Sequence, residues 1–270
     1  QRLLEKYANG EVKEKPTLDK TKDGLQTQLQ SLLRESWYDE YSQADHRLGY
    51  TQRGTGNGFL KCIYKELRPW LFHDKYSVDI VRCHTSLLLG AWEFCRSKGT
   101  VPEDKTIAKL YSRGIDALDC ELAPIADMFG VSPKTLWSAM LNKDRGTDVR
   151  ISNNALLSSY HNAIIKAGEH CEGHPLVSGR VPNKSTLLPR QYRQKCAFLL
   201  ERACLDLLIK TLTEDENYEP GIAVNDELIF SARGPFELEE LELSLNAALT
   251  RALQFKVRCR VTRLTFPEQI

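Results

Sequence analysis

The chain lacks several features that mark particular classes of protein. Of its 270 residues only 2 are Met, and aromatic residues make up 9%. No run approaches the roughly 18 uninterrupted apolar residues that a membrane span needs, so we expect no transmembrane segment and no membrane partner. Residues 1–22 contain no apolar block of signal-peptide type. We therefore expect no secretory leader and an intracellular location.

A strong net charge is also missing. The 37 Lys and Arg residues nearly balance the 36 Asp and Glu residues, which gives a net charge of +1. Total charge therefore does not indicate a polyanionic partner. Segments 178–200 and 250–266 nevertheless carry basic residues and no acid, which predicts local basic surfaces, although a merely solvated face is the alternative for each. The basic residues that we assign to nucleic-acid binding are Arg190, Arg193, Lys195, Lys256, Arg258 and Arg260.

The eight cysteines include no Cys-x-x-Cys pair. They lie largely in apolar contexts, so we expect reduced thiols in the core of an intracellular protein rather than a disulfide framework. One group offers possible zinc ligands: His161, His170, Cys171 and His174. Its spacing matches none of the common zinc patterns, so we do not assign a zinc site to it.

The order of the expected elements predicts an α+β protein. Apolar residues at helical spacing predict helices at 18–43 and 59–71, with a loop or short hairpin at 48–57 between them. Further helices are expected at 86–92, 106–111, 121–129, 133–141, 154–168, 189–212 and 237–253. Short β-type runs predict a strand at 76–81, a hairpin at 221–231 and a last strand at 255–264. This order predicts a palm-like fold, a small antiparallel sheet with a helical insertion.

Two carboxylates stand out from this pattern. Asp79 lies in the middle of an otherwise apolar strand, where a buried, uncompensated carboxylate is costly, so we expect something to neutralise it. Asp226 lies at the apex of the expected hairpin. If the strand of Asp79 pairs beside that hairpin, the two carboxylates converge and can share divalent cations, as in a two-metal site. The alternative is that Asp79 is a paired structural acid and that Asn225 and Asp226 are ordinary turn residues.

Two segments resemble motifs of one enzyme family. Residues 76–84, Tyr-Ser-Val-Asp-Ile-Val-Arg-Cys-His, resemble motif A of the family A DNA polymerases, the bacterial DNA polymerase I type, and especially its divergent viral and mobile-element relatives. Residues 223–230, Ala-Val-Asn-Asp-Glu-Leu-Ile-Phe, resemble motif C, whose family form is Val-His-Asp-Glu-Leu. The resemblance implies a polymerase-like palm in which Asp79 and Asp226 bind two Mg²⁺ ions. It also implies that Glu227 is the neighbouring catalytic acid.

A third segment is similar in position to the family's nucleotide-binding fingers helix, motif B. The resemblance implies that Lys134 on this helix contacts the incoming triphosphate. The residues that we assign to the nucleotide are Arg82, His84, Lys134 and Asn142. The family's phosphate-binding arginine, one turn before the lysine, falls on Gly130 in this chain. The cations that remain as substitutes for it are Lys109, Arg145 and Arg150.

Two positions depart from the family pattern. The histidine of motif C is replaced by Asn225, which keeps a polar group for the primer end but does not titrate near neutral pH. The glutamate that restricts ribose, five residues after the motif A aspartate, is replaced by His84. We expect deoxynucleotides to be preferred, with measurable incorporation of ribonucleotides.

The sequence therefore predicts a family A-like DNA polymerase, a template-dependent nucleotidyltransferase with roles such as DNA replication. Its expected partners are a primer-template nucleic acid, nucleoside triphosphates and, if the chain belongs to a longer polypeptide, a replication complex. Two alternatives remain: a single-subunit RNA polymerase or primase-like enzyme, and a non-catalytic nucleic-acid-binding subunit. The expected division is an N-terminal helical region and loop (1–58), the palm with motif A (59–100), a fingers-like insertion (101–188) and the palm with motif C (189–270).

Overall fold

The computed structural model describes most of the chain after residue 71. The described residues are 40–42, 51–53, 72–143, 146–181, 187–224 and 226–265. By its internal contacts the chain divides into two compact units. The first consists of Gln1–Gln43, Tyr50–His73 and Leu264–Ile270, and the second of Ala44–Gly49 and Asp74–Arg263.

Two short strands are described in the first unit. β1 (Glu40–Ser42) pairs antiparallel with β2 (Thr51–Arg53), so that Tyr41 lies opposite Gln52. The prediction of a helix at 18–43 is therefore wrong for residues 40–42, because they form β1 and pair with β2. The rest of that helix, and the helix expected at 59–71, lie outside the described residues.

The second unit contains a four-stranded sheet in the order β4-β5-β3-β6, with each neighbouring pair antiparallel. Its strands are β3 (Tyr76–Ile80), β4 (Tyr218–Val224), β5 (Glu227–Ala232) and β6 (Cys259–Arg263). The expected strand at 76–81 and the hairpin are confirmed, and Val224 pairs with Glu227 around a two-residue turn. The last strand is shorter than expected, since it begins at Cys259.

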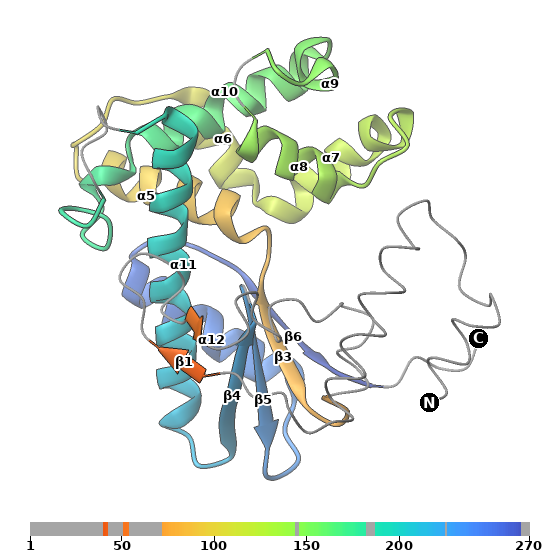
Figure 1. Ribbon diagram of the computed structural model, residues 1–270, viewed down its shortest axis with the longest axis vertical. Coiled ribbons are helices and arrows are strands. Elements are labelled where there is room, and N and C mark those ends of the chain that lie inside the picture. Colours follow the sequence, from red (N-terminus) through yellow and green to blue (C-terminus); the bar gives the residue numbers. More distant parts are fainter. Residues whose placement is uncertain are drawn as a thin grey trace. The chain divides into compact units, whose positions relative to one another are not determined.

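Alternation along β3 sets the two faces of this sheet. Val78 and Ile80 are buried, and Val78 lies opposite Leu228 on β5 and Val261 on β6, both buried. Opposed residues of antiparallel strands point to the same side, so these apolar side chains form one continuous face. They share a core with the buried residues of α11 (Pro189–Thr213) and α12 (Leu238–Leu253), which lie beside the sheet (Figure 1).

Helices make up most of the remainder of the second unit. They are α5 (Cys83–Ser97), α6 (Lys105–Arg113), α7 (Ile115–Met128), α8 (Pro133–Asn142), α9 (Val149–Ser152), α10 (Ala155–Glu169), the 3₁₀ helix η2 (Cys171–Gly173), α11 (Pro189–Thr213) and α12 (Leu238–Leu253). The helices expected in this region are present, although α7 begins six residues earlier than expected. The α+β class with a small antiparallel sheet and a helical insertion is thus confirmed.

Capping residues explain where several helices begin. The side chain of Asp104 accepts hydrogen bonds from the backbone N–H groups of Thr106 and Ile107 at the start of α6. Ser132 caps α8, and Pro133 follows at its first position, where the missing N–H costs nothing. α8 is therefore fixed at the end that carries Lys134.

Close approach between elements depends on one glycine of α5. A Cβ atom added at Gly90 would lie 2.1 Å from the ring of Phe255. Phe255 is itself 3% exposed and follows α12 directly. Gly90 therefore lets the segment between α12 and β6 pack directly on α5, which begins at the end of β3.

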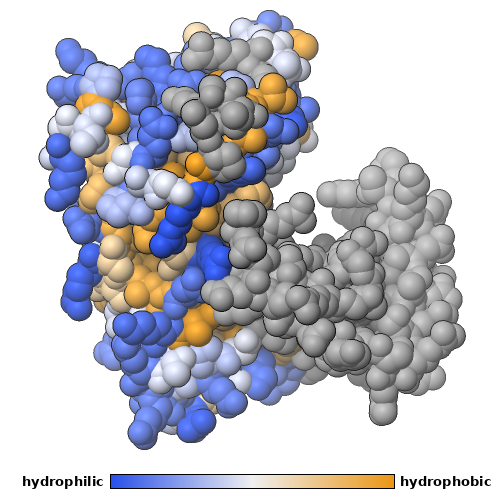
Figure 2. Space-filling view, turned by 60° about the vertical axis from the view of Figure 1, so that its left-hand side comes forward, coloured by the Kyte–Doolittle hydropathy of each residue, from blue (hydrophilic) through white to orange (hydrophobic). Residues whose placement is uncertain are grey.

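The surface of the described part is unevenly hydrophobic. On the face seen in Figure 2, hydrophobic residues gather in a central band between more hydrophilic areas above and below. Within the described ranges, no helix is both long enough and apolar enough to span a bilayer.

Candidate active site

A cavity of about 300 Å³ opens where four parts of the second unit meet. These parts are the junction of β3 with α5, α8, the middle of α11 and the β4–β5 turn. The lining residues are Arg82, Cys83, His84, Thr85, Lys134, Trp137, Ser138, Leu141, Asn142, Phe198, Glu201 and Asp226. The four residues assigned to the nucleotide from sequence, together with Asp226, therefore lie around one cavity.

The junction of β3 with α5 holds Arg82 in an unusual backbone conformation. Arg82 has φ 47° and ψ 47°, a left-handed conformation that costs about 1 kcal/mol or more for a residue with a Cβ atom. Its carbonyl accepts a hydrogen bond from the backbone N–H of Ser86, and the hydroxyl of Ser86 donates to the carbonyl of Val81 at 2.7 Å. These bonds close the turn, and Arg82 precedes α5 in a fixed position.

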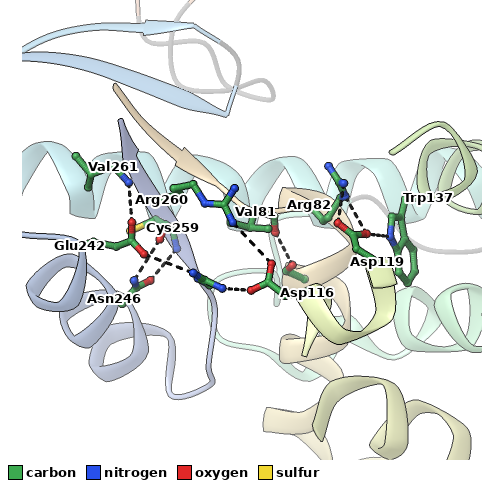
Figure 3. A network of polar contacts seen from close by, with 12 residues as sticks. Val81, Arg82, Asp116, Asp119, Trp137, Glu242, Asn246, Cys259, Arg260 and Val261 are labelled. Atoms are coloured by element: carbon green, nitrogen blue, oxygen red, sulfur yellow. Dashed lines mark hydrogen bonds and ion pairs between the residues drawn. The ribbon is translucent and has the colours of Figure 1, made fainter. Parts of the chain in front are cut away.

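The guanidinium of Arg82 binds Asp119 on α7. Its Nε donates to Oδ1 at 3.3 Å and a terminal nitrogen donates to Oδ2 at 2.7 Å. The same carboxylate accepts the indole N–H of Trp137, on α8, at 2.6 Å (Figure 3). Asp119 thus connects the β3–α5 junction to the helix that carries Lys134. Sequence reasoning did not single out Asp119.

His84 is held by a buried carboxylate from the long helix. Its Nε2 lies 2.6 Å from Oε2 of Glu201, and its ring meets that of Phe198 edge-on at 4.9 Å. Glu201 is only 2% exposed, while the side chain of His84 is 24% exposed. Sequence reasoning missed Glu201, although a signal was present: it stands among buried, mainly apolar positions of α11, where an acid needs a partner.

Asp79 and Glu227, one from each of the two resembling motifs, lie on adjacent strands, and Asp226 lies in the β4–β5 turn. Asp79 is directly opposite Glu227, and the backbone N–H of Ile80 donates to the carbonyl of Asp226 at 3.4 Å. Asp79 is exposed, so the expectation of a buried carboxylate is wrong. The reason is its side of the pleat: Val78 and Ile80 point into the core, and Asp79 between them points away from it.

Burial and nearby negative charges both affect the pKa of the Cys83 thiol. Burial raises its pKa well above the usual range, and the negative charges of Glu201, Asp226 and Asp79 raise it further. The thiol therefore stays protonated and uncharged.

The donor set bears on which metal fits. Carboxylate oxygens are the ligands that Mg²⁺ prefers, and Asp79, Asp226 and Glu227 supply them on neighbouring strands. These residues fit Mg²⁺ by donor type, although their ligand atoms do not form a group within 4.8 Å of one another. Among the described residues, the group of three possible ligands within 4.8 Å of one another is instead Cys83, His84 and Glu201, which offers a mixed set of sulfur, nitrogen and oxygen.

α8 contributes Lys134 and Asn142 to the lining of the cavity. Lys134 is exposed near the start of α8, and Asn142, its last residue, accepts a hydrogen bond at 2.9 Å from Gln194 of α11. Two of the substitutes expected for the phosphate-binding arginine lie elsewhere. Arg150 is paired with Asp148, and Lys109 lines a separate cavity. The third, Arg145, lies outside the described residues. Among the described residues, the arginine that lines this cavity is Arg82.

The basic residues before and within β6 alternate with buried ones. Lys256, Arg258 and Arg260 are exposed, while Val257, Cys259 and Val261 between them are buried. Both arginines of this set contact Asp116 of α7, and Arg258 also lies 3.7 Å from Glu242. Their charge is therefore partly balanced within the protein.

The second basic set is not one surface. Arg190 is exposed and Lys195 is half-buried, but Arg193 is only 1% exposed. Its assignment to nucleic-acid binding is wrong for this structure, because it lies on the inward face of α11 with its carbon chain against Gly168 of α10. Asn225, expected at the primer end, lies outside the described residues.

Comparisons with known proteins give little further support. No protein-family model and no curated relative matches the chain. Among solved structures it is similar to the POL domain of Pol1 from M. smegmatis in complex with DNA primer-template and dNTP, with 13% identity and a TM-score of 0.46. The match covers 92% of this chain and 51% of that one, so the chain spans about half the length of that domain. A likeness this distant carries no argument about function, which has to come from the residues of the site.

Proposed function

We propose that the chain is a template-dependent nucleotidyltransferase of the DNA polymerase type, which extends a primer with nucleoside triphosphates and uses Mg²⁺. One observation carries this proposal: residues chosen from sequence in three separate segments line a single cavity. They are Arg82, His84, Lys134, Asn142 and Asp226. Unrelated surface residues that are far apart in the chain have no reason to meet in this way.

The charges around the cavity suit a triphosphate. Arg82 and Lys134 are cations on two of its walls, and Asp226 is a carboxylate on a third. Phosphoryl transfer relies on this combination, because cations stabilise the charge that builds up on the phosphates, while carboxylates hold the metal ions. In motif B the family's phosphate-binding arginine falls on Gly130, and the spacing did not identify a substitute. We assign this role to Arg82.

Asp79 and Asp226 are the residues that would hold two Mg²⁺ ions, with Glu227 beside them. When bound, such ions activate the attacking 3′-hydroxyl and stabilise the leaving pyrophosphate. The antiparallel pairing of β3 with β5 supports this assignment, since it keeps Asp79 opposite Glu227 and next to the turn that carries Asp226.

His84 is proposed to border the sugar of the incoming nucleotide. It stands five residues after Asp79, where the family has a glutamate, and the buried carboxylate of Glu201 holds its ring. An imidazole crowds a ribose 2′-hydroxyl but also offers it a hydrogen bond, so it discriminates less strictly than a fixed carboxylate.

Exposed or half-buried basic residues outside the cavity are proposed to bind the phosphates of the primer-template. They are Arg190, Lys195, Lys256, Arg258 and Arg260. Contacts of this kind position a duplex without reading its sequence, as a template-dependent enzyme requires.

Extension of a labelled primer on a DNA template, with Mg²⁺ and deoxynucleotides, tests the proposal. Asp79→Asn and Asp226→Asn should each remove nearly all extension while binding of the duplex is retained. Asp206→Asn is the matched control, because Asp206 is an exposed acid of α11 whose contact with Arg202 is a 3.7 Å surface pair. It should extend the primer like the wild type.

Three outcomes would contradict the proposal. Near-wild-type extension by either aspartate variant would remove the role given to that aspartate. Preferred use of ribonucleotides, or synthesis without a primer, would identify an RNA polymerase or primase-like enzyme. Tight duplex binding with no extension by the wild type would identify a non-catalytic nucleic-acid-binding subunit.

A further inference from the structure

Asp119 is the point where two walls of the cavity are joined. It is a half-buried residue of α7, and it does not itself line the cavity. Its two carboxylate oxygens accept three hydrogen bonds, two from Arg82 and one from Trp137. Both of these donors do line the cavity, and Figure 3 shows them on either side of the carboxylate.

The contact with Asp119 leaves part of the Arg82 guanidinium available. Arginine has five N–H donors in a planar fork, and Asp119 engages Nε and one terminal nitrogen. The other terminal nitrogen keeps both of its donors. The backbone of Arg82 is fixed in the left-handed turn, so the carboxylate fixes the remaining freedom, that of the side chain.

Trp137 links the same carboxylate to α8. It is 2% exposed, and its ring stacks on that of Tyr160 from α10 at 6.3 Å. Trp137 follows Lys134 by three residues, so the two side chains lie on the same side of the helix. A carboxylate that holds Trp137 therefore also holds the wall of the cavity from which Lys134 extends.

We infer that Asp119 is a positioning residue for the triphosphate site. It holds Arg82 and α8 in a fixed position relative to each other, so that Arg82 and Lys134 bind the same phosphate chain. This rests on the proposed function. Preorganised donors bind a charged group more tightly than free side chains, because less freedom is lost on binding. Loss of Asp119 should therefore weaken binding of the triphosphate, although it removes a negative charge from the neighbourhood.

The same helix offers a matched control. Asp116 lies one turn before Asp119 and binds arginines as well, namely Arg258 and Arg260. Those arginines do not line the cavity. Removal of the negative charge from either aspartate changes the net charge equally, so a difference between the two variants reports on the contacts of Asp119 with Arg82 and Trp137.

Affinity for deoxynucleoside triphosphate is the measurement, made by calorimetry on the full chain with Mg²⁺ and a primer-template whose primer lacks the 3′-hydroxyl. Binding is then read without turnover. Asp119→Asn should bind the triphosphate roughly tenfold or more weakly than the wild type, as expected for the loss of a charged hydrogen-bonding partner. With the primer-template at saturating concentration, so that any change in duplex binding does not enter, Asp116→Asn should stay within about twofold of the wild type.

Two further variants separate positioning from general damage to the fold. Trp137→Phe keeps an aromatic ring but loses the N–H donor, and it should give a smaller loss of affinity in the same direction. Arg82→Gln should lose affinity, and the addition of Asp119→Asn to it should cost little more, because residues that act through one contact are not additive.

Wild-type affinity in Asp119→Asn, or tighter binding, would overturn the inference and make Asp119 a structural residue or a competitor of the phosphates. Fully additive losses in the double variant would show that Asp119 does not act through Arg82. A wild type that binds no triphosphate at all would overturn the proposed function, and this inference with it. A wild type that binds but does not extend a normal primer would contradict the proposed function alone.

Discussion

His84 and Glu201 are 117 residues apart in the chain, and a 2.6 Å contact between Nε2 and Oε2 joins them. One residue belongs to the first turn of α5 and the other to the middle of α11. The buried carboxylate fixes one nitrogen of the imidazole, and Phe198 limits rotation of the ring from the side. A side chain held in this way can act as a wall of the cavity rather than as a mobile group.

Substitution of His84 should change the choice of sugar. His84→Ala removes the ring, so we expect incorporation of ribonucleotides to rise severalfold relative to deoxynucleotides if crowding is the cause of selectivity. The ratio of kcat/KM for matched deoxy- and ribonucleotides measures this. His170→Ala, which alters a half-buried histidine away from the cavity, serves as the control. An unchanged ratio in His84→Ala would make His84 a packing residue.

Neutralisation of the basic residues near β6 should weaken nucleic-acid binding. Replacement of Lys256, Arg258 and Arg260 by Gln is expected to lower affinity evenly across sequences and to reduce the salt slope by about 0.9 for each phosphate that is no longer neutralised. Asp116→Asn should act in the opposite direction, because it frees the two arginines from an internal acid. Binding isotherms at several salt concentrations test both. An unchanged affinity and slope in the triple variant would leave these residues as a solvated face.

Gly90→Ala should destabilise the fold. Alanine normally favours a helix over glycine by up to about 1 kcal/mol, but here its methyl group would meet the ring of Phe255. We expect a net loss of about 1–3 kcal/mol in the free energy of unfolding, measured with urea. Gly234→Ala is the control, since nothing lies within 4 Å of its added Cβ. Equal stability of the two variants would mean that α5 and Phe255 are not in close contact.

Stability should fall in mild acid because of His174. Burial lowers its pKa below the ordinary value of 6.5. Its Nε2 bonds the carbonyl of Leu253 and its Nδ1 accepts the N–H of Leu176, which suits a neutral ring. As pH falls below 6.5, His174 becomes protonated in the unfolded chain but stays neutral in the folded one, so the free energy of unfolding decreases. The loss should be on the order of 1 kcal/mol between about pH 7 and about pH 5.

Urea unfolding at several pH values measures this dependence. His174→Gln removes the titrating group and should give a flatter profile, even if the variant is less stable at every pH. A wild-type profile that is flat over the same range would show that the ring takes up a proton without cost. The two internal hydrogen bonds engage both ring nitrogens of His174.

Local patterns were enough to predict most elements of the described fold. Short β-branched and apolar runs identified β3 and the hairpin, alternation identified β6, and helical spacing located α8, α10 and α11 within a few residues. α9 was not predicted, since its four residues are too few to show a period. The early start of α7 was also missed.

Several features of the site depend on contacts between distant segments, and no local pattern contains these. The exposure of Asp79 and the burial of Arg193 both follow from which face of an element meets the core. Periodicity identifies such faces for apolar residues but not for a single charge among them. Glu201 and Asp119 have roles only because His84 and Arg82 are brought to them, so neither stood out in the sequence.

The central place of β3 in the sheet also governs the order in which the protein can fold. Both of its partners come late in the chain: Ser77 of β3 bonds Thr262 of β6, 185 residues further on. During synthesis of the chain, β3 stays unpaired until β5 and β6 have been synthesised. The helices between β3 and β5 can already form from local contacts. Closure of the sheet is then the slow step, and it is also the step that brings Asp79 beside Glu227. The helical insertion is therefore expected to acquire protection from hydrogen exchange before Asp79 and Glu227 are brought together.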